Sequence, residues 1–167
     1  MPSERLAIHP GLTPQWGMRL TSPEFSDGGE LPWTMSAANE NRMPALELHE
    51  VPEGAESLAL VLEDLDSPVG ALTHWLAWNL PPDTTHLDAL TFPAHGRIGL
   101  SAFGKIGYLG PTPPEGRHIY RFTLSALDRM LDLPQGATRK QFQAAAKNHV
   151  MAWATLEGSI ERSGSQG

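Results

Sequence analysis

Cysteine is absent from the 167 residues of this chain. Disulfides, thiolate metal sites and a cysteine nucleophile are therefore excluded. Lys and Arg total 12 against 19 Asp and Glu, which gives a formal net charge of −7, and the basic residues form no cluster. Binding to nucleic acid or to an anionic lipid surface depends on a basic patch, so the sequence argues against both partners. Any anion that binds must be held by a local site.

Long apolar runs are missing as well. No segment approaches the ~18 apolar residues that a membrane-spanning helix needs. The first residues include an acidic side chain, and no apolar run of signal-peptide length follows them. We therefore expect a cytoplasmic protein without stable membrane insertion, and the sequence leaves open whether it is a monomer or a homodimer.

Glycine and proline are abundant, with 16 and 15 residues. Both interrupt regular structure, so they favour a turn-rich, mainly β fold over a helical bundle. The length suits one domain over residues 1–167, with an irregular N-terminal arm at 1–16 and a frayed tail at 163–167. Hydrophobic residues make up 40% of the chain and charged residues 19%, a balance typical of a globular protein.

Periodicity predicts six strands and one helix. Alternation of apolar and polar residues predicts strands at residues 18–22, 45–51, 72–80 and 118–126, and a last strand is predicted at 153–160. The segment 57–64 is apolar throughout, which predicts a strand covered on both faces. Thr138 and Gln141 have the spacing of a helix capping box, and one face of the helix that follows carries Phe142, Ala145, Ala146 and Val150. Residues 83–116 show no clear periodicity.

Four polar side chains fall on mainly apolar strand faces: Asp64, His74, His118 and Tyr120. Strict alternation places His74 on the same face as Trp78. One histidine on such a face is more often a satisfied core residue than a ligand contact. Four buried groups without partners would each cost roughly 1–3 kcal/mol, so we expect them to meet one another or a ligand in a shared pocket.

The order and spacing of two long motifs resemble the phosphatidylethanolamine-binding protein family, and within it the bacterial Raf-kinase-inhibitor-like (YbhB/YbcL-type) branch. The first motif is Asp-Leu-Asp-Ser-Pro at 64–68 followed by His-Trp-Leu-Ala-Trp-Asn-Leu-Pro at 74–81. The second is Gly-Tyr-Leu-Gly-Pro-Thr-Pro-Pro-Glu-Gly-Arg-His-Ile-Tyr at 107–120. Further similarity at 25–32 and 41–48 extends the resemblance over residues 20–162.

The resemblance implies a β-sandwich of two antiparallel sheets with one C-terminal helix and few short helices. It also implies a small anion pocket lined by Asp64, His74, Gly110, Pro111, His118 and Tyr120, with Asp66, Trp78 and Pro113 as supporting residues. The chemistry of these groups agrees with that expectation. Imidazole N–H groups, the Tyr120 hydroxyl and the Gly110 amide can donate hydrogen bonds to a phosphate oxygen, and the Asp64 carboxylate can orient a histidine or accept from a protonated ligand.

Three positions depart from the family pattern. Leu65 stands where a proline is usual, Ile119 where an arginine is usual, and Met43 where a serine is usual. An aromatic residue expected near Leu48 is also absent. By alternation Ile119 points away from the pocket, so we expect its effect on packing to exceed its effect on ligand contact.

The preferred interpretation is a protein that binds a small phosphate-like anion or a phosphorylated ligand, with a regulatory or carrier role and a possible protein partner. A hydrolase of small esters or phosphoesters, using Asp64 with His74 or His118 as general base, is the alternative. It has less support because no Gly-x-Ser-x-Gly motif is present. A zinc site built from the same three residues is the weakest alternative, because no closely spaced ligand pair occurs. No cofactor is implied.

Overall fold

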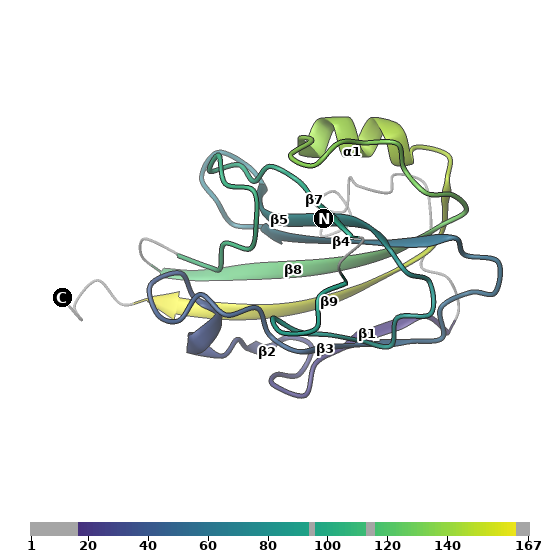
Figure 1. The fold of residues 1–167 in the computed structure, drawn as a ribbon. Coiled ribbons are helices and arrows are strands. Elements are labelled where there is room, and N and C mark those ends of the chain that lie inside the picture. Colours follow the sequence, from purple (N-terminus) through teal and green to yellow (C-terminus); the bar gives the residue numbers. More distant parts are fainter. Residues whose placement is uncertain (1–16, 94–95, 113–115, 163–167) are drawn as a thin grey trace.

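The computed structural model describes residues 17–93, 96–112 and 116–162. Two β-sheets and one α-helix form three layers, with the larger sheet between the helix and the smaller sheet (Figure 1). The three-stranded sheet has the order β1 (Arg19–Thr21), β3 (Leu46–His49), β6 (His86–Leu87). The six-stranded sheet has the order β2 (Gly29–Glu30), β9 (Val150–Arg162), β8 (Gly116–Leu127), β4 (Ser57–Asp64), β5 (Leu72–Leu80), β7 (Arg97–Ile98). The predicted mainly β, two-sheet fold is confirmed.

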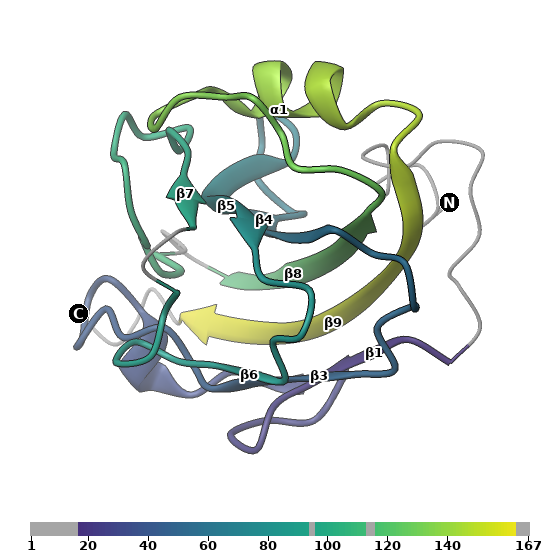
Figure 2. The same cartoon turned by 45° about the vertical axis from the view of Figure 1, so that its right-hand side comes forward.

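One pairing departs from the all-antiparallel prediction, because β2 pairs with β9 in parallel. The long strands β8 and β9 are antiparallel over their whole length, and β4 lies antiparallel to both β5 and β8. The six-stranded sheet is strongly curved, so that β9 reaches down toward the smaller sheet (Figure 2). Sheet twist of this kind follows from the right-handed twist of each strand.

The central strand β4 is covered on both sides. Leu58, Leu60 and Leu62 pack into the core between the two sheets, and Ala59 and Val61 pack into a second core beneath the helix. A strand buried on both faces has no polar side to alternate with, which explains the continuous apolar sequence of this segment.

The helix α1 (Arg139–Ala146) begins as the sequence predicts. The Thr138 hydroxyl accepts the Gln141 amide hydrogen at 3.1 Å, and the Gln141 side chain accepts the Thr138 amide hydrogen at 2.9 Å. These two bonds satisfy two amides that a helix leaves unpaired at its start. Phe142 and Ala146 are buried against the six-stranded sheet, as expected for the apolar face.

The segments without periodicity hold short elements that the sequence did not reveal. These are β2, β6, β7 and a 3-10 helix, η2 (Trp33–Met35). Two or three residues are too few to show a hydrophobic period. The predicted N-terminal arm, C-terminal tail and Pro113 lie outside the described residues. In the part of the chain that is described, no helix has the length and apolar character needed to cross a bilayer.

Candidate functional site

The C-terminal end of β4 and the beginnings of β5 and β8 meet at one end of the larger sheet. Asp64, the last residue of β4, stands opposite Leu72 of β5 and opposite Tyr120 of β8. The segment 107–112 covers this end. Four predicted residues are therefore brought together from three strands, and all four are buried: Asp64, His74, His118 and Tyr120.

A β-bulge in β5 turns His74 into this site. Leu62 of β4 pairs with Trp75 and the next residue, Glu63, pairs with Thr73, so His74 is the extra residue between two pairs. Thr73 then faces the helix layer, where its hydroxyl accepts a hydrogen bond from Arg139 at 2.9 Å. A bulge re-aims side chains in this way because it breaks the strict alternation of the strand.

His118 and Asp64 form a buried pair. The Nδ1 atom of His118 lies 2.8 Å from Oδ2 of Asp64. Because a carboxylate only accepts, Nδ1 carries the hydrogen. The other ring nitrogen, Nε2, has no hydrogen-bond partner among the described residues. His118 also keeps 8% of its surface exposed, more than the other three side chains, so the site is most accessible at this residue.

Tyr120 lies between the two histidines. Its ring is 5.3 Å from the His74 ring, edge to face, and 6.4 Å from the His118 ring, nearly parallel. Its hydroxyl is buried and has no partner in good hydrogen-bond geometry among the described residues, although the Asp64 carboxylate and the Thr112 backbone lie close enough to it to shift its pKa. Burial raises the pKa of the Tyr120 phenol, and the nearby Asp64 carboxylate raises it further. The phenol therefore keeps its proton and can donate it to a ligand.

His74 is held in one tautomer by the backbone. Its Nδ1 lies 3.0 Å from the carbonyl oxygen of Leu109, which can only accept, so Nδ1 carries the hydrogen and Nε2 has the lone pair. Burial lowers the pKa of His74, although the Leu109 carbonyl and Asp64 oppose that shift. The ring also packs against Phe103 at 4.9 Å. A neutral imidazole with an acceptor nitrogen follows.

Gly110 does not act as the sequence suggested. Its amide donates to Oδ1 of Asn41 at 2.7 Å, so it is not available to an anion. A Cβ atom at this position would lie 1.7 Å from the carbonyl oxygen of Met35. The glycine is required because two backbone segments approach closely here. The Pro111 carbonyl accepts the Ser36 hydroxyl at 2.7 Å, which ties the same segment to residue 36.

Asp66 supports the site by joining two strands. Its Oδ2 accepts the amide hydrogen of Ile119 at 2.8 Å, and its own amide donates to Oδ1 of Asp64 at 2.8 Å. The Leu65 amide donates to the Ile119 carbonyl at 2.9 Å. A proline at position 65 could not make that bond, so this departure from the family pattern adds a contact between β4 and β8.

Trp78, which was predicted to support the site, lies elsewhere in the structure. The prediction for Trp78 is wrong: the bulge separates it from His74, and it packs beneath α1 with its ring 6.3 Å from that of Phe142.

Met43 and Leu48, two of the positions that depart from the family pattern, are buried in the core between the sheets. The described residues contain no group of three or more His, Cys, Asp or Glu that could hold a metal ion.

Sequence reasoning missed the groups that hold the site in place. Asn41 binds the covering segment, Leu109 supplies a backbone carbonyl, and Phe103 packs on His74. A backbone acceptor leaves no trace in the sequence. Asn41 did carry a signal, because asparagine tolerates a left-handed backbone and bonds to nearby main-chain groups.

Comparisons with known proteins agree with this fold. Residues 21–161 match the family model described as phosphatidylethanolamine-binding protein. A UPF0098 protein of Methanothermobacter thermautotrophicus is 40% identical over 151 residues, covering 87% of this chain and 99% of the relative. A UPF0098 protein of Chlamydia trachomatis is 37% identical over 152 residues, covering 87% of this chain and 99% of the relative.

Two crystal structures are similar to the whole fold. One is a phosphatidylethanolamine-binding protein homologue from Chlamydia trachomatis, 35% identical with a TM-score of 0.83, covering 89% of this chain and 99% of that chain. The other is YbcL of E. coli, a member of the same family, 26% identical with a TM-score of 0.81, covering 87% of this chain and 98% of that chain.

The fold and the site thus define a two-sheet β protein with a polar site at the end of its central strands. This chain belongs to the phosphatidylethanolamine-binding protein family, and its similarity to YbcL is consistent with the bacterial branch. Membership supports a ligand-binding protein in general terms.

Proposed function

We propose that the chain binds a small phosphate-like anion, free or as part of a phosphorylated ligand, between His118, Tyr120 and His74, in a regulatory or carrier role. One observation carries the proposal. Among the described residues, the His118–Asp64 pair leaves Nε2 of His118 without a hydrogen-bond partner, beside the buried Tyr120 hydroxyl, which makes no hydrogen bond of good geometry there. Buried polar groups are almost always hydrogen-bonded in folded proteins, so a ligand that pairs with both would be stabilised here.

The protonation states favour a phosphate that still carries one acidic hydrogen. Protonated His118 can donate from Nε2, and its positive charge balances the Asp64 carboxylate. Tyr120 donates from its hydroxyl. The lone pair on Nε2 of His74 is an acceptor and would match a P–OH group. The site thus offers two donors and one acceptor, which suits a hydrogen phosphate group better than a fully deprotonated one.

Replacing His118 by alanine tests this proposal. His149 provides a matched control, because its Nδ1 lies 2.9 Å from Oδ1 of Asp128 and it precedes β9 at the opposite end of the β8–β9 pair. We expect His118→Ala to weaken binding of inorganic phosphate by on the order of 1–3 kcal/mol, and His149→Ala to leave it unchanged, by titration calorimetry. Equal affinities for wild type and His118→Ala would refute the proposal.

A hydrolase is the second candidate, and one observation favours it. Asp64 orients His118 as an acidic residue orients the histidine of a catalytic triad, which leaves Nε2 free to act as a general base. Ser101 offers no nucleophile, because its hydroxyl accepts the amide hydrogens of Phe103 and Lys105 within a turn. A screen with nitrophenyl esters and phosphoesters, using Asp64→Ala as the comparison, decides between the two. A binding protein shows no turnover that the substitution removes.

A further inference from the structure

Asn41 connects to both sides of Leu109, the residue whose carbonyl binds His74. Oδ1 of Asn41 accepts the Gly110 amide hydrogen at 2.7 Å, and Nδ2 donates to the Tyr108 carbonyl at 3.3 Å. One side chain therefore holds the peptide groups before and after Leu109. This fixes the direction in which the Leu109 carbonyl points.

The backbone of Asn41 is itself adapted to this role. Its φ is +52°, in the left-handed region that asparagine tolerates better than most residues. Its amide donates to the Ser36 carbonyl at 2.9 Å. The side chain is thereby aimed across to the segment 107–111, which comes from a distant part of the sequence.

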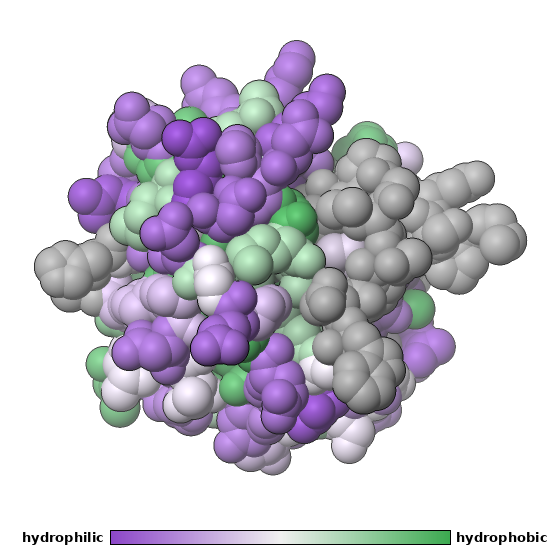
Figure 3. Space-filling view, turned by 90° about the vertical axis from the view of Figure 1, so that its right-hand side faces the viewer, coloured by the Kyte–Doolittle hydropathy of each residue, from purple (hydrophilic) through white to green (hydrophobic). Residues whose placement is uncertain are grey.

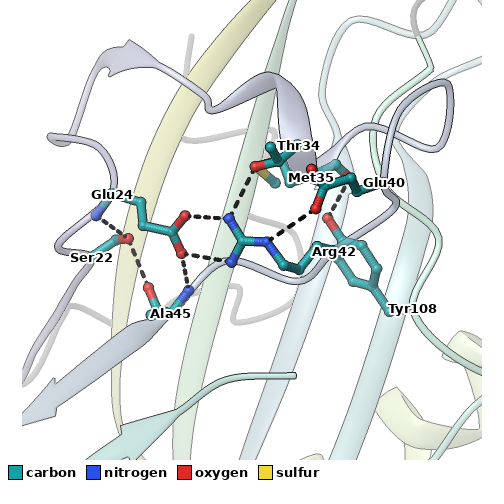
Figure 4. A network of polar contacts seen from close by, with 8 residues as sticks. All are labelled: Ser22, Glu24, Thr34, Met35, Glu40, Arg42, Ala45 and Tyr108. Atoms are coloured by element: carbon teal, nitrogen blue, oxygen red, sulfur yellow. Dashed lines mark hydrogen bonds and ion pairs between the residues drawn. The ribbon is translucent and has the colours of Figure 1, made fainter. Parts of the chain in front are cut away.

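An ion pair anchors the chain directly after Asn41 (Figure 4). The Arg42 guanidinium donates to both carboxylate oxygens of Glu24, at 2.8 and 3.4 Å, and to the Thr34 hydroxyl at 3.1 Å. Glu24 also accepts the Ala45 amide hydrogen at 2.7 Å. The hydrogen bond from Arg42 lowers the pKa of Glu24, which keeps the pair charged at neutral pH. The segment carrying Asn41 is therefore fixed on its own side.

A second contact reinforces the same junction. The Tyr108 hydroxyl donates to the Met35 carbonyl at 2.8 Å (Figure 4). The same carbonyl lies close to Gly110. Burial raises the pKa of Tyr108, so its hydroxyl remains protonated and can donate. Several hydrogen bonds thus join segments 33–42 and 107–111, and Asn41 supplies the two bonds nearest to Leu109.

From these contacts we propose that Asn41 is a positioning residue that acts through Leu109 on His74. By fixing the Leu109 carbonyl it fixes the hydrogen on Nδ1 of His74, and so makes Nε2 an acceptor toward the ligand. The inference rests on the proposed function for the ligand, but the tautomer of His74 can be measured without any ligand. Asn41 touches no reacting group itself.

Asn41→Gly is the test, because glycine keeps the left-handed backbone and removes both side-chain bonds. Asn148→Gly is the matched control, since Asn148 is exposed and also has a positive φ, +70°. Long-range proton–nitrogen NMR spectra report the tautomer of each histidine, and calorimetry reports phosphate affinity. We expect His74 to lose its uniform Nδ1–H tautomer in Asn41→Gly, with phosphate binding weakened roughly three- to tenfold, while Asn148→Gly matches wild type.

Asn41→Asp is a second variant if the glycine variant fails to fold. Aspartate can still accept from Gly110 but cannot donate to the Tyr108 carbonyl, so an intermediate effect on the His74 tautomer is expected. An unchanged His74 tautomer in the folded variant overturns the inference, as does an altered tautomer with unchanged phosphate affinity. If wild type binds no phosphate, the proposed function fails, and a tautomer change in Asn41→Gly would still support the positioning role.

Discussion

The two histidines of the site resemble each other in residue type but not in bonding. His118 directs its Nδ1 hydrogen to a carboxylate, and His74 directs the same hydrogen to a backbone carbonyl. His74 is also more deeply buried, at 2% exposed against 8%. One ring is therefore suited to carry charge on ligand binding and the other to stay neutral.

The buried His74 should make the stability of the protein pH-dependent. Burial lowers its pKa below the ordinary value of 6.5, so the unfolded chain takes up a proton more readily than the folded one. This histidine therefore supports stability above about pH 6.5, and that support is lost as the pH falls below it. The slope contributed by one such group is at most about 1.4 kcal/mol per pH unit.

Urea unfolding at pH values on both sides of 6.5 checks this prediction. We expect the free energy of unfolding of wild type to fall more steeply toward acid than that of His74→Gln, whatever the stability of the variant at neutral pH. Parallel curves for wild type and His74→Gln would show that His74 is not the group responsible.

For single residues, the sequence predicted which side chains form the site but not how each of them is oriented. Asp64, His118 and Tyr120 lie where strand alternation predicts, because β4 and β8 pair without interruption near the site. His74 reaches the site for a different reason than the predicted one, since only the bulge separates it from Trp78. A bulge depends on pairing with a distant strand, which a single segment of sequence does not encode.

Among the elements, the contact between segments 107–111 and 33–36 determines how the site is covered. Gly110→Ala would place a methyl group against the Met35 carbonyl, at a position where the backbone on both sides is tied down. We expect a loss of about 3 kcal/mol or more in the free energy of unfolding, together with loss of phosphate binding.

Gly70→Ala is the comparison for that substitution. Gly70 has a positive φ of +100° but nothing within 4 Å of an added Cβ, so only backbone strain should be felt, at about 1 kcal/mol, with phosphate binding retained. Chemical denaturation of both variants gives the two values. Similar losses for the two glycines would mean that close approach at Gly110 is not the dominant effect.

The long elements were predictable from sequence because each carries its own period or cap. The bounds of β4 and β5 agree with the prediction, and the helix starts at the residue after Thr138. The short β6 and β7 were missed because they exist only through pairing, β6 with β3 and β7 with β5. The covering segment has no regular structure, and its conformation is set by contacts with Ser36 and Asn41 rather than by local sequence.

For the molecule as a whole, the negative charge opposes the proposed ligand. The net charge is −7. The surface at the end of the molecule opposite the site is largely hydrophilic, with small apolar areas among the hydrophilic residues (Figure 3). An anion is then attracted by the buried site and repelled by the overall field. Salt screens long-range repulsion between exposed charges more than short contacts within a buried site.

Phosphate affinity should therefore hold steady or rise when the salt concentration increases from about 20 to about 200 mM. Calorimetry in chloride and in glutamate salts measures this and shows whether chloride competes for the site. Binding through scattered surface cations would instead weaken steadily with salt. A steep loss of affinity in both salts would count against a buried, locally balanced site.

The extra residue at His74 in β5 has a consequence for how such sites diverge. Deleting one residue at the start of β5 would restore regular pairing with β4 and would turn the His74 imidazole toward the helix layer. Every other side chain of the site would stay unchanged. Insertions and deletions in β5, and not only substitutions, can therefore remove the acceptor nitrogen of His74 from the site and leave an apolar surface in its place. Two homologues that both have a histidine aligned with His74 have the same chemistry there only if β5 has the same number of residues before that histidine.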